Sequence, residues 1–157
     1  MPQRRAINDD GSPKTPDGGS WDEIAESSLV VRLTHGSSSF CFQGDIETAQ
    51  EAALARMPDD LSCDALLVGH HGSRQASSAA WLARAQPEHA IASFGANAYG
   101  HPTSEALCRL QQAGATVYAT HRAGTIVAAS EGAGVRVEAA AETLDYCAAG
   151  ASYWPDG

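Results

Sequence analysis

The sequence predicts an α/β fold, in which a mixed β-sheet has helices packed against it. Three observations predict this fold: a β-branched hairpin comes first, helices and strands then alternate, and the strand expected at 65–68 is wholly apolar (ALLV). A strand without polar residues is typical of a sheet buried on both faces, and alternating elements favour parallel strands joined by helices. At 157 residues, the chain has room for one such domain.

Each element has its own local signal. Apolar and β-branched runs at 28–33 and 40–43 predict the hairpin, and alanines at helical spacing predict a helix over 47–57. Two serines before the second helix and Thr103 before the third are placed to cap them. The remaining elements expected are a strand at 65–68, a helix at 77–85, a strand at 90–94, a helix at 104–113 and strands at 116–119, 125–129 and 135–137.

The chain divides into three parts by composition. Residues 1–26 are expected to form a disordered or loop-like leader, because they are rich in Pro, Gly, Asp and Ser and have few apolar side chains. The folded domain is expected over 27–138. Residues 139–157 are weakly patterned and should form an irregular tail.

The bulk charge and hydropathy exclude several partners. A formal net charge of −9 argues against a surface that grips nucleic acid or an anionic membrane without a metal, since both need a basic patch. The first residues do not resemble a signal peptide, and no apolar run approaches the ~20 residues of a transmembrane helix. As given, the chain is expected to be soluble, and cytoplasmic if it stands alone.

The four cysteines indicate no zinc site, because none of them lies at a short spacing from another. Each has apolar neighbours, which favours buried free thiols over a disulfide or a metal site. They are Cys41, Cys63, Cys108 and Cys147.

Three glycine-containing loops follow predicted strands, where ligands bind in open α/β sheets. They are Gly44-Asp45, the run 69–73 (GHHGS) and the run 99–102 (YGHP). Asp45 could bridge two divalent metals or could instead cap the following helix. His101 could be a neutral imidazole ligand, although a lone histidine is more often a surface or packing residue.

The GHHGS run favours function over packing, because two glycine-flanked histidines after an apolar strand have little structural purpose. His70 or His71 could reach a metal or stabilise charge on a phosphoryl oxygen, while Ser73 and the backbone beside Gly72 bind another oxygen. Which ring does which stays open. The rival chemistry makes Ser73 a nucleophile, but the G-x-S-x-G elbow is absent.

The order of these motifs resembles a known family. SLVVRL, FQGDIE, LLVGHHGSRQASS, YGHP and AGATVYATHRAGTI follow one another over about 27–126. Together they are similar to the C-terminal half of the hydrolase domain of the ComEC DNA-uptake (competence) family, which has the metallo-β-lactamase fold. The resemblance implies half of an α/β/β/α sandwich. It also implies a location at the outer face of the cytoplasmic membrane if the chain is part of a ComEC protein.

The resemblance implies roles for particular residues. It makes Asp45 and His101 metal ligands, and it makes His70 and His71 the catalytic pair that faces the substrate phosphate, with Gly72 and Ser73 binding substrate. The family site holds two divalent metals, zinc or manganese, and hydrolyses phosphodiesters, with DNA as one candidate substrate. Its HxHxDH ligand cluster is absent here. Two ligands fall short of the roughly three that each metal needs.

An incomplete domain needs a partner. An uncovered sheet face of about 500 Å² at ~25 cal/mol/Å² forgoes ~12 kcal/mol of burial, which is comparable to the net stability of an ordinary domain, ~5–15 kcal/mol. We therefore expect a complementary N-terminal half or a homodimer mate. Two functions remain: part of a metal-dependent phosphodiesterase or nuclease, or a non-catalytic relic or interaction module of the same fold.

Overall fold

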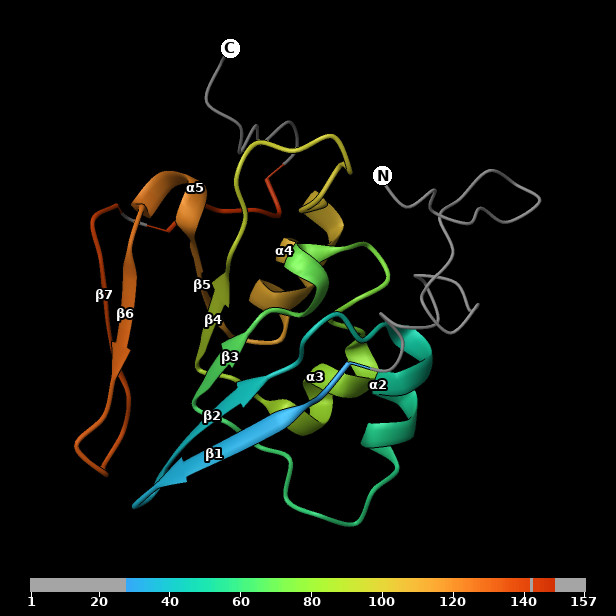
Figure 1. Cartoon of the computed structure of the whole chain (residues 1–157), viewed down its shortest axis with the longest axis vertical. Coiled ribbons are helices and arrows are strands. Elements are labelled where there is room, and N and C mark those ends of the chain that lie inside the picture. The colour runs from blue at the N-terminus through green and yellow to red at the C-terminus, as the bar shows by residue number, and fades with distance from the viewer. Residues whose placement is uncertain (1–27, 142, 149–157) are drawn as a thin grey trace, which may run out of the picture.

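Five strands form one sheet in the order β1-β2-β3-β4-β5, with helices beside it (Figure 1). The structure is a computed structural model that describes residues 28–141 and 143–148, so the predicted leader at 1–26 lies outside the described residues. β1 pairs antiparallel with β2, and β2 to β5 run parallel to one another. The predicted mixed α/β fold is confirmed. The strands are β1 (Val31–His35), β2 (Ser38–Phe42), β3 (Ala65–Leu67), β4 (His89–Ala92) and β5 (Thr116–Ala119).

Three helices follow the parallel strands in turn and pack on one face of the sheet. They are α2 (Thr48–Ala55), α3 (Ala79–Ala85) and α4 (Ser104–Gln112). The expected caps are present: the Ser78 hydroxyl accepts from the Trp81 N–H, and the Thr103 hydroxyl accepts from the Ala106 N–H. The main core lies between these helices and the sheet, and its largest buried side chains include Trp81, Leu66, Leu107, Leu110 and Val117.

The first hairpin is tighter than the sequence suggests. The predicted strands at 28–33 and 40–43 left 34–39 for the turn, yet the first strand continues to His35 and the second begins at Ser38. Gly36 permits this short turn with a φ of +60°, a conformation that two-residue hairpin turns require. A Cβ at Gly36 would lie 2.3 Å from the carbonyl oxygen of Gly132, so the turn also needs the absence of a side chain.

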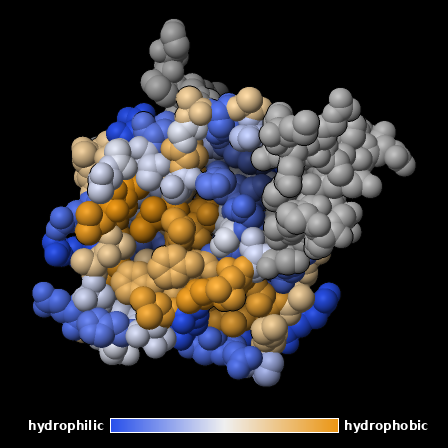
Figure 2. Space-filling model, in the orientation of Figure 1, coloured by the Kyte–Doolittle hydropathy of each residue, from blue (hydrophilic) through white to orange (hydrophobic). Residues whose placement is uncertain are grey.

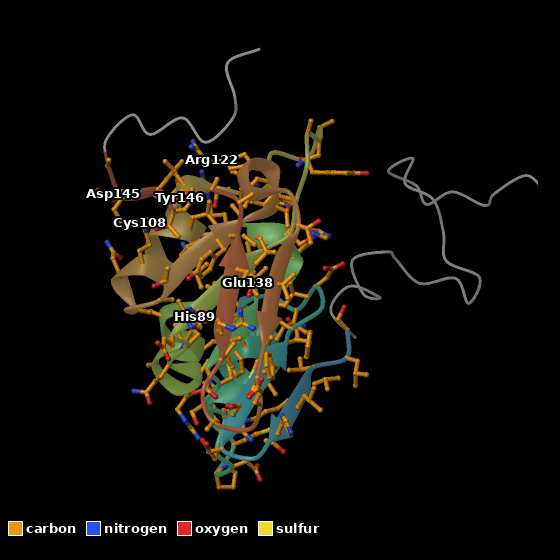
Figure 3. The ribbon with its side chains drawn as sticks, turned by 90° about the vertical axis from the view of Figure 1, so that its left-hand side faces the viewer. His89, Cys108, Arg122, Glu138, Asp145 and Tyr146 are labelled. Atoms are coloured by element: carbon orange, nitrogen blue, oxygen red, sulfur yellow. A yellow bond between two sulfur atoms is a disulfide. The ribbon has the colours of Figure 1, made fainter. Side chains whose placement is uncertain are left out.

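A second, two-stranded sheet packs near the other face of the first. Its strands are β6 (Ile126–Ala129) and β7 (Arg136–Ala139), which follow the short helix α5 (Thr120–Ala123). The connection between β6 and β7 reaches the main sheet, because the His89 Nε2 and the Val135 carbonyl oxygen are 3.2 Å apart. Figure 3 shows His89 beside this hairpin.

The remaining part of that second face is open and apolar (Figure 2). Strand register places alternate side chains of β1, β2 and β3 on this side of the sheet. We call this surface the open apolar face. Each of its members is 36–53% exposed, although a sheet of this size usually buries both apolar faces. The open apolar face consists of Val31, Leu33, Phe42 and Leu67.

The expectation of four free thiols is wrong for two of the cysteines. Cys41 and Cys63 are free and buried, whereas Cys108 of α4 and Cys147 form a disulfide. The 39-residue separation gives no local signal, because Cys147 reaches α4 only when the segment at 143–148 docks. Buried Tyr146 holds that segment through its N–H, which donates to the Gln111 Oε1 at 2.7 Å (Figure 3).

Among the helices of the described residues, none combines the length and the apolar character that a membrane crossing requires.

Candidate functional site

Three loops at one edge of the sheet are joined by their backbones. The His70 N–H donates to the Gly44 carbonyl oxygen at 2.9 Å, and the Thr103 N–H donates to the Gly72 carbonyl oxygen at 2.9 Å. Gly72 has a φ of +81°, and a Cβ there would lie 2.7 Å from the Cβ of Pro102. The contact between these loops therefore depends on a glycine. The loops expected to carry the site do come together, at the ends of β2, β3 and β4.

The paired histidines have an unusual backbone conformation. They lie in the turn at Gly69–Gly72 and have left-handed, non-helical φ, ψ values of 44°, 43° for His70 and 52°, 26° for His71. Residues other than glycine rarely adopt positive φ, and such strain persists where the surrounding structure enforces it, often at functional sites. Here the enforcing contacts are the backbone bonds on both sides of the turn.

His70 lies in a small polar cluster. Its Nδ1 is 2.9 Å from the Glu47 Oε1, and the Ser73 hydroxyl donates to the same oxygen at 3.2 Å. The rings of His70 and His101 meet edge to face, with centroids 5.2 Å apart. Ser73 is 3% exposed, and its hydroxyl is occupied by the hydrogen bond to Glu47. This burial disfavours Ser73 as a nucleophile.

His71 faces a hollow of about 410 Å³ beside the cluster. Its Nδ1 is 2.8 Å from the Ser93 carbonyl oxygen, which holds the ring against the segment after β4. Pockets of this size commonly admit small organic ligands. The lining residues include His71, His101, Phe94, Asn97, Tyr99 and Thr120. The site thus presents two imidazoles to one accessible hollow.

Asp45 lies directly after Gly44, whose carbonyl oxygen accepts from His70, so it belongs to the same edge of the sheet. His101 offers a buried Nδ1 that has no hydrogen-bond partner among the described residues, which suits a ligand. Within residues 28–141 and 143–148, however, no three His, Cys, Asp or Glu side chains are grouped so that they could hold a metal ion. The described residues alone therefore do not fit a two-metal centre.

The surroundings of His101 favour the neutral form of its imidazole. Burial and the neighbouring His70 lower the pKa of His101 below the ordinary value of 6.5. His71 lowers this pKa further, and the Glu47 carboxylate acts in the opposite direction. A neutral imidazole has a free lone pair, which both metal binding and proton acceptance require.

The lowered pKa of His101 predicts a loss of stability in acid. Above the unfolded-state pKa near 6.5, His101 is neutral in both states and contributes its full stability; this contribution is lost as pH falls through the lower folded-state pKa. We expect the urea midpoint to fall less between about pH 7.5 and about pH 5 in His101→Asn than in the wild type. An equal fall in the two proteins would contradict this prediction.

Sequence reasoning missed three residues that shape the site. Glu47 contacts His70 and Ser73, as described above. Gln43 and Glu51 are fully buried and bonded to each other, with the Gln43 Nε2 2.9 Å from the Glu51 Oε1. The Gly69 N–H also donates to the Gln43 Oε1 at 3.3 Å. The sequence does contain a signal for these residues: Gln43 follows β2, and Glu47 and Glu51 are one helical turn apart. Two acids at this spacing are also typical of the solvent-exposed side of an ordinary helix, so the signal was not distinctive.

Comparison with known proteins gives two informative matches, although no protein-family model matches the chain. Over 116 residues the chain is 35% identical to ComE operon protein 3 of Bacillus subtilis (strain 168), which covers 73% of this chain. Over 101 residues it is 35% identical to competence protein ComA of Neisseria gonorrhoeae, which covers 63% of this chain. The chain spans about 15% of the length of each relative. It is therefore homologous to one segment of each of these proteins, which supports its assignment to a competence family.

Proposed function

We propose that the chain is one half of a metallo-β-lactamase-like phosphodiesterase domain that acts on DNA during its uptake. The observation that carries the proposal is the junction of the three loops, where strained His70 and His71 lie beside His101 at the ends of parallel strands. The names of the two relatives, both competence proteins, favour DNA as the substrate. In a competence protein, the outer face of the cytoplasmic membrane would be the place of action.

In this proposal the imidazoles of His70 and His71 act on the scissile phosphate. Their Nε2 atoms can accept a proton or, when protonated, stabilise charge on a phosphoryl oxygen. Gly72 and Ser73 shape the turn that faces the phosphate. Asp45 and His101 would contribute ligands to two divalent metals, zinc or manganese, and the other half of the domain would supply the remaining ligands. These metals would supply Lewis-acid catalysis when bound.

Metal analysis and hydrolysis assays of the completed domain test this proposal. We expect zinc or manganese to co-purify with the chain when it is co-expressed with the stretches that flank the matching segment in a relative. The metal should be lost in Asp45→Ala and in His101→Ala. Hydrolysis of a nitrophenyl phosphodiester and of DNA should follow the metal. Metal-loaded protein without hydrolysis of either substrate would support the non-catalytic interaction module instead.

A stoichiometric metal in the isolated chain would contradict the view that half of the site is missing. Inductively coupled plasma mass spectrometry of the wild-type chain and of Asp45→Ala distinguishes a specific metal from a contaminant, because only a specific metal depends on the carboxylate.

We propose that the open apolar face binds another segment of the longer competence protein. The relatives are several times longer than the chain, and four apolar side chains of adjacent strands lie exposed together. The occupant would be the complementary half of the domain, packed sheet against sheet. A second copy of this chain is the competing outcome.

Charge on the open apolar face should prevent this association. We expect Leu33→Glu to weaken co-purification with the flanking stretches at least about tenfold, because a carboxylate would be buried without a partner. Val127→Glu is the matched control, since Val127 is 47% exposed but lies on β6 outside this face. A dimer of the isolated chain in sedimentation velocity, dissociated by Leu33→Glu, would identify a second copy as the occupant instead.

A further inference from the structure

The two adjacent histidines are held by different kinds of acceptor. The His70 Nδ1 is 2.9 Å from a carboxylate oxygen of Glu47, and the His71 Nδ1 is 2.8 Å from the main-chain carbonyl oxygen of Ser93. A carbonyl or ionised carboxylate oxygen only accepts hydrogen bonds. Each Nδ1 therefore carries a hydrogen atom, and each neutral ring has its lone pair on Nε2.

Glu47 is placed unusually for a residue at the start of a helix. It is the N-cap residue of α2, yet its side chain makes no cap hydrogen bond. N-cap side chains normally accept from the first free N–H groups of their own helix. The Glu47 side chain is instead 24% exposed and directed across to the histidine turn, where it meets both His70 and Ser73.

The same oxygen therefore connects two parts of the turn. Ser73 follows the turn and donates to the Glu47 Oε1, and the Gln75 N–H donates to the Ser73 hydroxyl at 3.3 Å. His70 is the second residue of the turn, and its Nδ1 meets the same oxygen. Because both contacts end on one carboxylate, the orientation of the His70 ring is coupled to the position of Ser73.

We infer that Glu47 is a positioning residue of the proposed site, which holds His70 in the Nδ1–H tautomer with Nε2 available to the substrate. The catalytic role of Glu47 rests on the proposed function, whereas the tautomer of His70 can be measured without any reaction. It also separates the roles of the two rings. His70 depends on a side chain that can be substituted, whereas His71 depends on a backbone carbonyl group that no substitution of Glu47 removes.

Nuclear magnetic resonance of the ¹⁵N-labelled chain tests the inference directly. Two-bond ¹H–¹⁵N correlations show which imidazole nitrogen carries the hydrogen atom. At about pH 8, where histidines are mostly neutral, we expect both His70 and His71 of the wild type to be Nδ1–H. An Nε2–H form of His70 in the wild type would overturn the inference without any variant.

Two variants separate the hydrogen bond from the charge. In Glu47→Ala, His70 should change to mainly Nε2–H, the form that an unrestrained imidazole favours in water, while His71 stays Nδ1–H as the internal control. In Glu47→Gln, His70 should stay Nδ1–H, because the amide oxygen still accepts. An unchanged His70 in Glu47→Ala, or an equal change at His71, would overturn the inference.

Kinetics link the tautomer to the proposed activity. In the completed domain we expect Glu47→Ala to lower kcat about 10- to 100-fold with little change in KM, as for other residues that orient a functional imidazole. Absence of hydrolysis in the wild type would count against the proposed function alone. An unchanged kcat beside an active wild type would count against the positioning role of Glu47.

Discussion

Replacing Glu51 by alanine is expected to lower the free energy of unfolding by about 3–5 kcal/mol. The Glu51 carboxylate is fully buried, and it accepts from the N–H groups of Ser77 and Ser78 at 2.6 and 2.7 Å. It also accepts from the Gln43 Nε2 at 2.9 Å. Alanine would leave three donors without an acceptor, those of Gln43 and Ser77 fully buried and that of Ser78 partly buried, each at a cost of up to about 1–3 kcal/mol. Urea unfolding measures the loss.

Glu88→Ala is the control for this measurement, because the Glu88 side chain is 72% exposed. It should change the free energy of unfolding by less than about 0.5 kcal/mol. A loss below about 1 kcal/mol in Glu51→Ala would mean that water satisfies the three donors. Gln43 also accepts from the Gly69 N–H, at the start of the histidine turn. A large loss of stability in Glu51→Ala would therefore also indicate that this buried pair supports the turn.

Replacing His70 by asparagine is expected to lower kcat of the completed domain by about 100- to 10,000-fold, the usual contribution of a positioned acid or base. Asparagine is preferred to alanine here, because His70 has a φ of 44° and asparagine tolerates the left-handed region better than most residues. The loss should therefore reflect the missing imidazole rather than a distorted turn. Steady-state hydrolysis of a nitrophenyl phosphodiester measures it.

His35→Asn is the matched control, because it makes the same chemical change at the end of β1, beside the hairpin turn and away from the three loops. Its kcat should stay within about twofold of the wild type, as expected for a surface substitution away from the site. If His70→Asn also kept the wild-type kcat, the strained turn would have only a structural role. That result would favour the second proposed function, a non-catalytic interaction module.

Local sequence signals predicted most of the elements. The ALLV run marked β3, Thr103 marked the start of α4, and Gly114 after that helix has the positive φ of a helix stop. These features depend on neighbours in sequence, so they can be recognised without a fold. The predicted strand ends of the first hairpin were wrong by a few residues. Its two-residue turn depends on the close approach of Gly36 to Gly132, which lies in the distant β6–β7 hairpin.

The candidate site was predictable as a set of loops but not as a set of contacts. The glycines, the paired histidines and His101 follow predicted strands, and parallel strands bring such loops to one edge. Glu47 was overlooked, because an acid at the start of a helix is ordinary in sequence. Only the packing of α2 against the histidine turn directs its carboxylate to His70.

By itself, the sequence determined the α/β class, the order of the strands and of the three main helices, and the motifs that relate the chain to competence proteins, because each is written in local pattern and composition. The tertiary structure alone decided the acceptor of each imidazole, the buried Gln43–Glu51 pair, the Cys108–Cys147 disulfide and the open apolar face. All four depend on contacts between separate elements of the fold, and such contacts exist only after the chain has packed.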